Sequence, residues 1–178
     1  MKLRAVVEED YADVVALANV AYRATGDGAS WNSEAGILEG MRLTMSSLRE
    51  DLAKGAELLV WRDDDVLLMG TVFLQPKEDG VWYLGLLTVR PDGQNRGAGK
   101  GLLAEAEAYV KSRGGKRVRM TVLAVRETLI SWYQRRGYLE TGVTEAFPYG
   151  EERFGKPLRD DLYFVVLEKG LEDLSHMS

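Results

Sequence analysis

The chain has 178 residues, of which 46% are hydrophobic and 29% charged, a size and composition typical of one soluble globular domain. It contains no cysteine, which excludes disulfides, thiolate metal sites and a cysteine nucleophile, and its single histidine, His176, lies where chains usually fray, which disfavours histidine-based catalysis or metal binding. The 23 basic and 28 acidic residues give a net charge of −5, without the basic stripe that nucleic-acid binding requires.

The sequence gives no indication of export or of a membrane anchor. No apolar run approaches the ~20 residues that a bilayer span needs. Residues 1–10 have too short an apolar stretch for a signal peptide before they turn acidic. We therefore expect a cytoplasmic protein with no membrane or nucleic-acid partner and no metal, folded as one domain over residues 1–170 with a frayed tail over residues 171–178.

Hydrophobic spacing defines the elements of the N-terminal half. Apolar side chains recur every three and four positions over residues 10–22, which predicts a helix. Ser47 followed by Glu50 fits a capping box for a second helix. Residues 63–65, three aspartates, predict a hairpin turn rather than a cation site, because adjacent side chains do not converge. In chain order we expect a strand over 2–7, a helix over 10–22, a helix from Thr44 or Ser47 to about Ala53 that is ended by Gly55, and strands over 57–62 and 66–75, with residues 33–41 unassigned.

The C-terminal half contains a longer apolar run. Residues 81–90 are almost continuously apolar, as in a central strand covered on both faces, and Gly85 within them predicts a bulge or a close backbone approach. After it we expect a glycine-rich loop over 91–101, a helix over 102–113, a strand over 117–124, a helix over 127–136, a strand over 138–145, an irregular loop over 147–160 and a strand over 162–168. This order predicts a mixed α/β sheet with helices on its faces.

The most specific stretch is the glycine-rich sequence QNRGAGKG over residues 94–101, which lies between a buried strand and an amphipathic helix. A helix N-terminus offers unpaired N–H groups and the positive end of the helix dipole. Glycines let the backbone approach a ligand closely, and Arg96 and Lys100 add positive charge. We therefore predict a phosphate-binding loop rather than a turn without a ligand.

Two nucleotide-binding motifs do not fit this loop. A P-loop needs glycine at position 94 and serine or threonine after the lysine, where the chain has Gln94 and Gly101. A dinucleotide fingerprint needs glycine at position 102, where the chain has Leu102, and should follow the first strand of a βαβ unit. Both are disfavoured, although a looser nucleotide loop, as in a nucleotide-phosphate enzyme, stays open.

Three stretches resemble the GNAT acyltransferase superfamily, in the right order and on the right elements. Gln94-x-x-Gly97-x-Gly99 resembles its Gln/Arg-x-x-Gly-x-Gly/Ala motif. Residues 87–91 (LTVRP) resemble the end of its central strand and the start of its pyrophosphate loop, and residues 129–138 (LISWYQRRGY) resemble its "LYxxxGF" helix and turn. The likeness extends over nearly the whole chain. It implies the α/β (α+β) class, with a mixed, mostly antiparallel sheet of about seven strands and about four helices on its faces.

The resemblance implies transfer of an acetyl group from acetyl-CoA to a primary amine, with a small molecule as the expected acceptor and direct attack in a ternary complex. Backbone N–H groups of the loop would bind the pyrophosphate. The pantetheine arm would pair, like an added strand, with the edge of the central strand where it splays from residues 119–123. The cofactor-binding residues implied are Leu87, Thr88, Val89, Gln94, Asn95, Arg96, Gly97, Ala98, Gly99, Lys100, Arg126 and Tyr133.

Two residues carry the catalytic roles that the resemblance implies. Tyr133 matches the tyrosine of the family that protonates the leaving thiolate. Its helical spacing with Leu129 and Ile130 makes a packing role equally compatible with the sequence. A backbone N–H near Leu87 or Thr88 would bind the oxyanion, and Thr88 is also a candidate for relaying a proton through water.

The chain departs from the family pattern at two places. Residues 81–90 contain no carboxylate, although relatives often have a glutamate base on this strand. Glu145, Asp160 and Asp161 are candidate bases acting through water, and an acceptor that arrives partly neutral is the alternative. Arg126 stands where many relatives have an asparagine that binds pantetheine. It is predicted either to bind phosphates or a substrate carboxylate, or to be a solvated arginine at a helix start.

In the fold that the resemblance implies, the acceptor groove lies between residues 22–42 and 147–161. Both segments carry aromatic and charged side chains suited to binding a small molecule. Their arginines favour an acceptor with a carboxylate or phosphate, such as an amino-acid derivative. The substrate-binding residues expected are Trp31, Arg42, Tyr83, Phe147 and Tyr149, although Phe147 and Phe154 fit equally well as plugs that hold the loop on the core.

Several alternatives stay open at this point. A CoA-binding regulatory or interaction domain with weak catalysis fits the missing strand carboxylate. An acetyltransferase that acts on a protein or peptide amine fits the same motifs. Trp132, Leu139 and the last strand suit a homodimer interface and suit core positions equally well.

Overall fold

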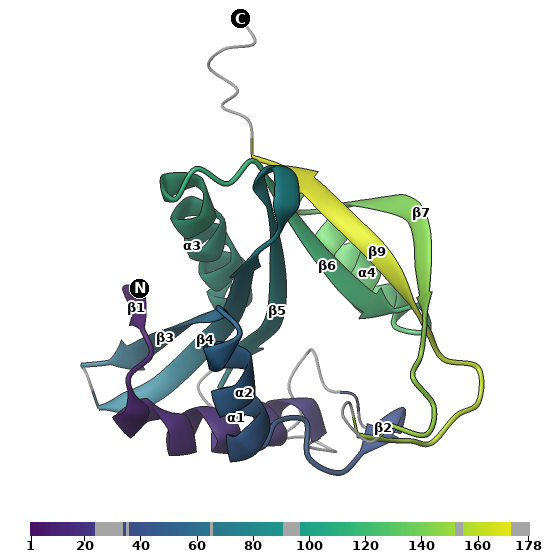
Figure 1. The fold of residues 1–178 in the computed structure, drawn as a ribbon, viewed down its shortest axis with the longest axis horizontal. Helices are drawn as coiled ribbons and strands as arrows, with labels where there is room; N and C mark the ends of the chain where they lie inside the picture. Colours follow the sequence, from purple (N-terminus) through teal and green to yellow (C-terminus); the bar gives the residue numbers. More distant parts are fainter. Residues whose placement is uncertain (24–33, 35, 65, 91–96, 152–154, 172–178) are drawn as a thin grey trace, which may run out of the picture.

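A computed structural model describes residues 1–23, 34, 36–64, 66–90, 97–151 and 155–171 (Figure 1). Each strand and helix expected from the sequence lies within a few residues of its predicted position. In chain order the elements are β1 Leu3–Ala5, η1 Glu8–Asp10, α1 Tyr11–Arg23, β2 Leu38–Glu39, α2 Met45–Ala53, β3 Glu57–Asp63, β4 Leu67–Pro76, η3 Glu78–Gly80, β5 Val81–Val89, α3 Ala98–Ser112, β6 Arg117–Leu123, α4 Glu127–Gln134, β7 Leu139–Ala146, β8 Lys156–Pro157 and β9 Tyr163–Gly170.

Seven of the described strands form one sheet, in the order β1-β3-β4-β5-β6-β9-β7. All neighbours are antiparallel except β5 and β6, which are parallel and joined through α3, because a parallel pair needs a long crossover. The predicted mixed, mostly antiparallel sheet with helices is therefore confirmed. β2 and β8 form a separate antiparallel ladder that the sequence did not predict, because two residues are too few to show an alternating pattern.

The helices cover both faces of the sheet because successive strand side chains point to opposite faces. Leu58 of β3 packs in a buried cluster with Val14 of α1 and Leu48 of α2. Its neighbour Leu59 packs in a different buried cluster, with Leu102 of α3 and apolar residues of α4. α1 and α2 therefore lie on one face, and α3 and α4 on the other (Figure 1).

One predicted helix start is wrong, and at another the structure selects one of the two predicted caps, in both cases for local reasons. α3 begins at Ala98 rather than Leu102, because the left-handed turn closes at Gly97 (φ 89°) and the first turn already packs on the core. α2 is capped by Thr44 rather than by a Ser47–Glu50 box. The Ser47 N–H donates to Thr44 Oγ1 and the Thr44 N–H donates to Ser47 Oγ, both at 3.0 Å, so the box lies one turn earlier.

Of the three aspartates predicted to form a turn, Asp63 ends β3 and Asp64 follows it in a left-handed conformation (φ 48°), whereas Asp65 lies outside the described residues. Among the described residues there is no group of three or more histidine, cysteine or carboxylate side chains that would hold a metal ion. No helix in the described part of the chain is both long and apolar enough to cross a membrane.

β5 and β6 pair over only three residues and then diverge (Figure 1). Val81–Tyr83 pairs with Arg117–Arg119, and no pairing continues beyond that point, although both strands are described throughout. Opposite this gap, the register between β4 and β5 shifts between Thr71 and Phe73, and Leu86 has a positive φ of 51°. The bulge predicted at Gly85 is therefore present beside that glycine. It turns β5 away from β6.

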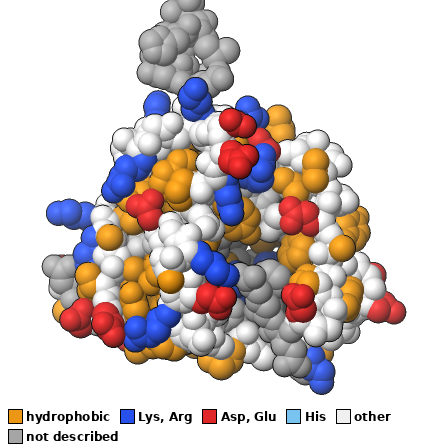
Figure 2. Space-filling view, viewed as in Figure 1, with side chains coloured by type: hydrophobic (Ala, Val, Ile, Leu, Met, Phe, Trp, Pro, Cys, Tyr) orange, Lys and Arg blue, Asp and Glu red, His pale blue; other side chains and the backbone are white. Residues whose placement is uncertain are grey.

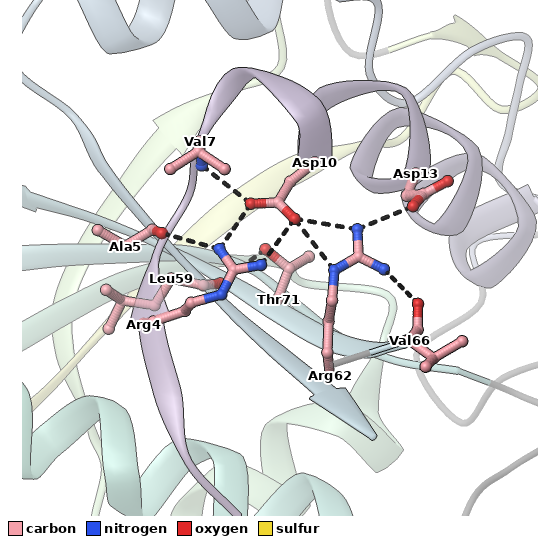
Figure 3. A network of polar contacts seen from close by, with 9 residues as sticks. All are labelled: Arg4, Ala5, Val7, Asp10, Asp13, Leu59, Arg62, Val66 and Thr71. Carbon is pink, nitrogen blue, oxygen red and sulfur yellow. Dashed lines mark hydrogen bonds and ion pairs between the residues drawn. The ribbon is translucent and has the colours of Figure 1, made fainter. Parts of the chain in front are cut away.

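A buried carboxylate ties the N-terminus to the sheet (Figure 3). Asp10 is only 2% exposed and receives hydrogen bonds from the Arg4 guanidinium (2.7 and 3.0 Å), from Arg62 Nε (3.0 Å) and from the Val7 N–H (2.9 Å). Arg62 also donates to Asp13 of α1 at 2.8 Å. The hydrogen bonds from Arg4 lower the pKa of Asp10 from 3.8 to about 2, against the opposing effect of burial.

We expect Asp10→Asn to lower the free energy of unfolding at pH 7 by about 3 kcal/mol, because the largely buried Arg62 and the half-exposed Arg4 lose the buried carboxylate that they share. The folded pKa lies below the ordinary value, so the wild type has this stabilisation in full above pH 3.8 and loses it as the pH falls toward about 2. Urea unfolding at several pH values should show that the difference in free energy of unfolding between variant and wild type shrinks over that range.

The matched control is Asp13→Asn, because Asp13 contacts the same Arg62 from a side chain that is 57% exposed. A surface pair contributes little, so this control should lose much less stability. Equal stability of Asp10→Asn and wild type at pH 7 would contradict the stabilising role assigned to Asp10.

Candidate active site

The divergence of β5 and β6 opens an inner pocket of about 90 Å³ between the strands. Residues 84–87 of β5 and 120–123 of β6 form its two sides. Tyr22 of α1 and Tyr133 of α4 also line it, so helices from both faces of the sheet contribute to its walls. The pocket therefore lies within the sheet, where a strand edge without a strand partner is available to a ligand.

A larger outer groove of about 1040 Å³ joins this pocket. Residues of α2, β4, β5, β6 and the end of β7 line it, and Figure 2 shows a hollow on this face between the β4–β5 part and the β9–β7 part of the molecule. Six residues line both spaces, namely Arg42, Tyr83, Gly85, Leu86, Thr121 and Phe164. At the junction, the hydroxyls of Tyr83 and Thr121 hydrogen-bond at 3.1 Å across the diverging strands. One continuous space therefore runs from the surface into the sheet.

The backbone of β5 faces this space near Leu87. The Leu87 carbonyl accepts a hydrogen bond from the buried Tyr22 hydroxyl at 3.3 Å. Thr88 and Val89 are fully buried and pair with Thr71 and Gly70 of β4, so of the residues 87–89 proposed for cofactor binding, only Leu87 lines the pocket. The Thr88 hydroxyl donates to the Leu86 carbonyl at 2.9 Å, which places this side chain in the strand structure rather than at the pocket wall.

Tyr133 is packed in the core and also lines the inner pocket. Its side chain is buried and packs edge-on against Trp132 and Tyr138, with ring centroids at 5.1 and 5.8 Å. Burial raises the pKa of Tyr133 far above its ordinary value, and Tyr22 adds to this effect, so the phenol keeps its proton throughout the physiological range.

Arg126 and Glu34 form a charged pair at the inner pocket. Arg126 occupies the N-cap of α4, and its side chain is 8% exposed, so the alternative of a solvated arginine is wrong. Its Nη1 lies 3.8 Å from Oε2 of Glu34, and both residues line the pocket. Glu34 was missed by the sequence interpretation, because it lies in the unassigned segment 33–41 and no local pattern distinguishes it from a surface glutamate.

The glycine-rich loop leads into α3. Gly97 is the N-cap and has no side chain to accept hydrogen bonds from the first N–H groups of the helix. Ala98 and Gly99 are buried against the core, whereas Lys100 is exposed. Gln94, Asn95 and Arg96, which were expected to bind the cofactor, lie outside the described residues.

The residues expected to bind substrate separate into two groups. Arg42 and Tyr83 line both the groove and the pocket, and the Arg42 guanidinium lies 5.1 Å from the centre of the Tyr22 ring. Phe147 and Tyr149 line neither space. Phe147 is buried, and the Tyr149 hydroxyl donates to the Arg159 carbonyl and accepts from the Leu162 N–H, so both hold the loop on the core. Trp31 and Phe154 lie outside the described residues.

The candidate bases from the sequence are all solvent-exposed. Glu145 of β7 is exposed but lines the outer groove. Asp160 and Asp161 are exposed and line neither space, and Asp161 pairs with Arg159 at 2.7 Å. Of these three, only Glu145 has access to the space where an acceptor would bind.

Comparison with known proteins identifies the family. The model of the acetyltransferase (GNAT) family matches residues 26–138, which is more than half of the chain. The chain belongs to this family. The resemblance found in the sequence is thereby confirmed. No curated protein matches the chain in sequence.

Solved structures of GNAT proteins share the fold. The ribosomal-protein-alanine N-acetyltransferase from Brucella melitensis has 19% identity and a TM-score of 0.68, covering 96% of this chain and 100% of that one. A chimaeric spermidine N-acetyltransferase from Vibrio cholerae has 15% identity and a TM-score of 0.66, covering 96% of each chain. A GNAT family acetyltransferase from Elizabethkingia anophelis with acetyl-CoA bound has 19% identity and a TM-score of 0.59, covering 70% of this chain and 82% of that one.

Proposed function

We propose that this GNAT protein transfers the acetyl group of acetyl-CoA to the primary amine of a small molecule, by direct attack in a ternary complex. The observation that carries the proposal is the junction of two spaces at the β5–β6 divergence. The inner pocket suits a thioester inserted between the strands, and the outer groove suits the acceptor that must reach it. Both reactants would meet at Tyr83 and Thr121, with no covalent enzyme intermediate.

The residues present fit acetyl-CoA. Beyond Tyr83, β5 has no strand partner on its β6 side, so its backbone can pair with the amides of the pantetheine arm, as an added strand would. The start of α3 at Gly97, where the first N–H groups have no partner within the helix and the helix dipole is positive, suits the pyrophosphate. Lys100 adds an exposed cation to the same turn. When bound, acetyl-CoA supplies the activated acetyl group.

The chain's own groups can promote the transfer. A backbone N–H near Leu87 would stabilise negative charge on the thioester oxygen as the nitrogen attacks. The Tyr133 phenol, which stays protonated because burial raises its pKa, would give its proton to the departing thiolate. The rate gain would come from positioning, charge stabilisation and proton transfer together.

A protein or peptide amine is the second acceptor class. The observation that favours it is the size of the outer groove, about 1040 Å³, which exceeds what a small amine fills. A third outcome is a CoA-binding domain with weak catalysis.

Two assays separate these functions. In a thermal-shift series with acetyl-CoA, CoA and ATP, acetyl-CoA at about 100 times its Kd should stabilise the fold by about 2.7 kcal/mol. Thiol release is then followed with ethanolamine, L-lysine, spermidine, phenethylamine and an N-terminally free Ala-Arg peptide amide. Turnover of a small amine supports the proposal, turnover of the peptide alone supports the second class, and binding without turnover supports the third. Stabilisation by ATP alone would contradict all three.

We expect Gly99→Asp to abolish stabilisation by acetyl-CoA, because a carboxylate at the start of α3 adds bulk and negative charge where the pyrophosphate would bind. Gly99 is buried, so Lys100→Glu, at an exposed position, provides a second variant that should weaken binding without unfolding the protein. The control is Ala108→Asp, which adds the same charge to an exposed position farther along α3. Wild-type affinity in both test variants would overturn the loop assignment.

We expect Tyr133→Phe to lower kcat by about 100-fold and to leave the Kd for acetyl-CoA nearly unchanged, because the ring is kept and only the proton donor is lost. Since the pKa of Tyr133 is raised, the wild-type rate should show no loss of this acid up to pH 9. Stopped-flow thiol release and calorimetric titration measure the two quantities.

Tyr138→Phe is the matched control, because it removes the same atom from a ring packed on Tyr133. The Tyr138 hydroxyl donates to Glu107 at 2.7 Å, and Tyr138 does not line the pocket, so this variant should lose stability and keep kcat. An unchanged kcat in Tyr133→Phe would remove Tyr133 from the mechanism.

A further inference from the structure

Arg42 lies where the outer groove meets the inner pocket, and it lines both spaces. The N–H groups of Arg42 and Leu43 donate to Asn19 Oδ1, and Asn19 Nδ2 donates to the Leu43 carbonyl at 2.8 Å. The Arg42 side chain is half-buried, and its guanidinium lies over the Tyr22 ring, 5.1 Å from the ring centre. Both the backbone and the charged end of this residue therefore contact α1.

The guanidinium of Arg42 differs from those of the other arginines at these two spaces. Arg119 of the groove pairs with a carboxylate of β9 at 2.9 Å, and Arg126 of the pocket lies 3.8 Å from Glu34. No carboxylate in the described parts of the chain pairs with Arg42, whose charged end contacts the Tyr22 ring. An aromatic face attracts a cation, but it does not offer the two oxygen acceptors that a guanidinium fork can bind. The fork is therefore available to a ligand with such oxygens.

The charges of the outer groove favour the Arg42 end as the place for an anion. Acidic side chains outnumber basic ones over the rest of its lining, and none of these acidic residues lines the inner pocket. They are Asp51, Glu78, Asp79 and Glu145, beside the basic residues Lys77 and Arg119. A negative group on an acceptor is repelled by these carboxylates and attracted by Arg42. An anionic acceptor would therefore bind with its negative group at the junction of the two spaces.

Tyr22 connects Arg42 with the strand edge where the thioester is proposed to bind. Its ring lies under the guanidinium, and its hydroxyl donates to the Leu87 carbonyl of β5 at 3.3 Å. In an amino acid only a short carbon chain separates the amine from the carboxylate. A carboxylate bound to Arg42 would therefore hold the amine in the same space as the thioester, which favours attack through proximity.

We propose that the acceptor is an amino carboxylic acid, and that Arg42 is the specificity-determining residue that binds its carboxylate through charge-assisted hydrogen bonds. The inference rests on the proposed function and names its substrate class. In the transfer, the neutral amine nitrogen forms a bond to the thioester carbon and the carbon–sulfur bond breaks. The nitrogen loses one proton and the thiolate gains one, so the products are an N-acetyl amino acid and CoA. The carboxylate keeps its charge throughout, and Arg42 makes and breaks no covalent bond.

The test compares amino acids with their own carboxamides, which have nearly the same shape without the negative charge. Glycine, β-alanine, L-phenylalanine and L-arginine are suitable, because each has a single primary amine. For the acid that the wild type acetylates fastest, we expect kcat/KM to exceed that of its carboxamide by about 10- to 100-fold. The carboxamide has the amine of lower pKa and hence the larger neutral fraction. A preference for the acid must therefore come from binding of the carboxylate.

Variants of Arg42 assign this preference to one side chain. Arg42→Met removes the charge and should raise KM for the acid by about 10- to 100-fold, with kcat and the Kd for acetyl-CoA nearly unchanged. This split is expected because the carboxylate is bound equally before and during the transfer. KM for the carboxamide should change little, so the preference disappears. Arg42→Lys, which keeps the charge and loses the planar fork, should keep part of it.

Arg49→Met is the matched control. Arg49 lies over the Tyr11 ring at 5.2 Å, in the same kind of contact, but it lines neither space. Its removal should leave the ratio of acid to carboxamide as in the wild type.

The outcomes distinguish this inference from the function on which it rests. If the wild type neither binds acetyl-CoA nor acetylates any amine, both fail. If it acetylates phenethylamine, spermidine or the carboxamides as well as it does the acids, the proposed function stands and the substrate class is overturned. If the wild type prefers the acids and Arg42→Met keeps that preference, or loses acid and carboxamide turnover equally, the role of Arg42 is overturned.

Discussion

The short pairing of β5 with β6 is the constraint on which the rest of the site depends. Parallel strands joined through a helix normally continue their ladder, yet these pair over Val81–Tyr83 alone and then separate. The bulge beside Gly85, with Leu86 at positive φ, turns β5 toward β4 and away from β6. A left-handed leucine is strained, and its buried contacts with α1 and α2 offset that cost. The result is a sheet with an internal edge, which a ligand rather than a strand can complete.

The same divergence determines which side chains meet. α1 and α2 on one face and α4 on the other would be separated by a closed sheet, but through the gap Tyr22 and Tyr133 line one pocket. Apolar and aromatic side chains line much of this pocket, so charges there act with less screening than at the surface. A buried tyrosine, a charged pair and a backbone edge thus lie around a space of about 90 Å³.

The two buried carboxylates of the described residues show two uses of arginine. Asp10 receives hydrogen bonds of 2.7–3.0 Å from two arginines and a backbone N–H, which uses its lone pairs and fixes the N-terminus. Arg126 lies 3.8 Å from Glu34 on the wall of a pocket. A saturated ion pair such as that of Asp10 suits a structural role, because proton uptake would cost several hydrogen bonds.

The elements, the mixed sheet, the family and several residues that line the candidate site could be predicted from the sequence. Alternation and helical spacing are local properties, and Tyr133, Leu87 and Tyr83 lie on elements that those patterns define. Tertiary structure alone decided what long-range packing controls. It buried Phe147 in the core, and started α3 four residues early because its first turn is buried. It also brought Glu34 to Arg126 across 92 positions of the chain, a pairing that no local pattern encodes because the two residues meet only once distant segments are packed together.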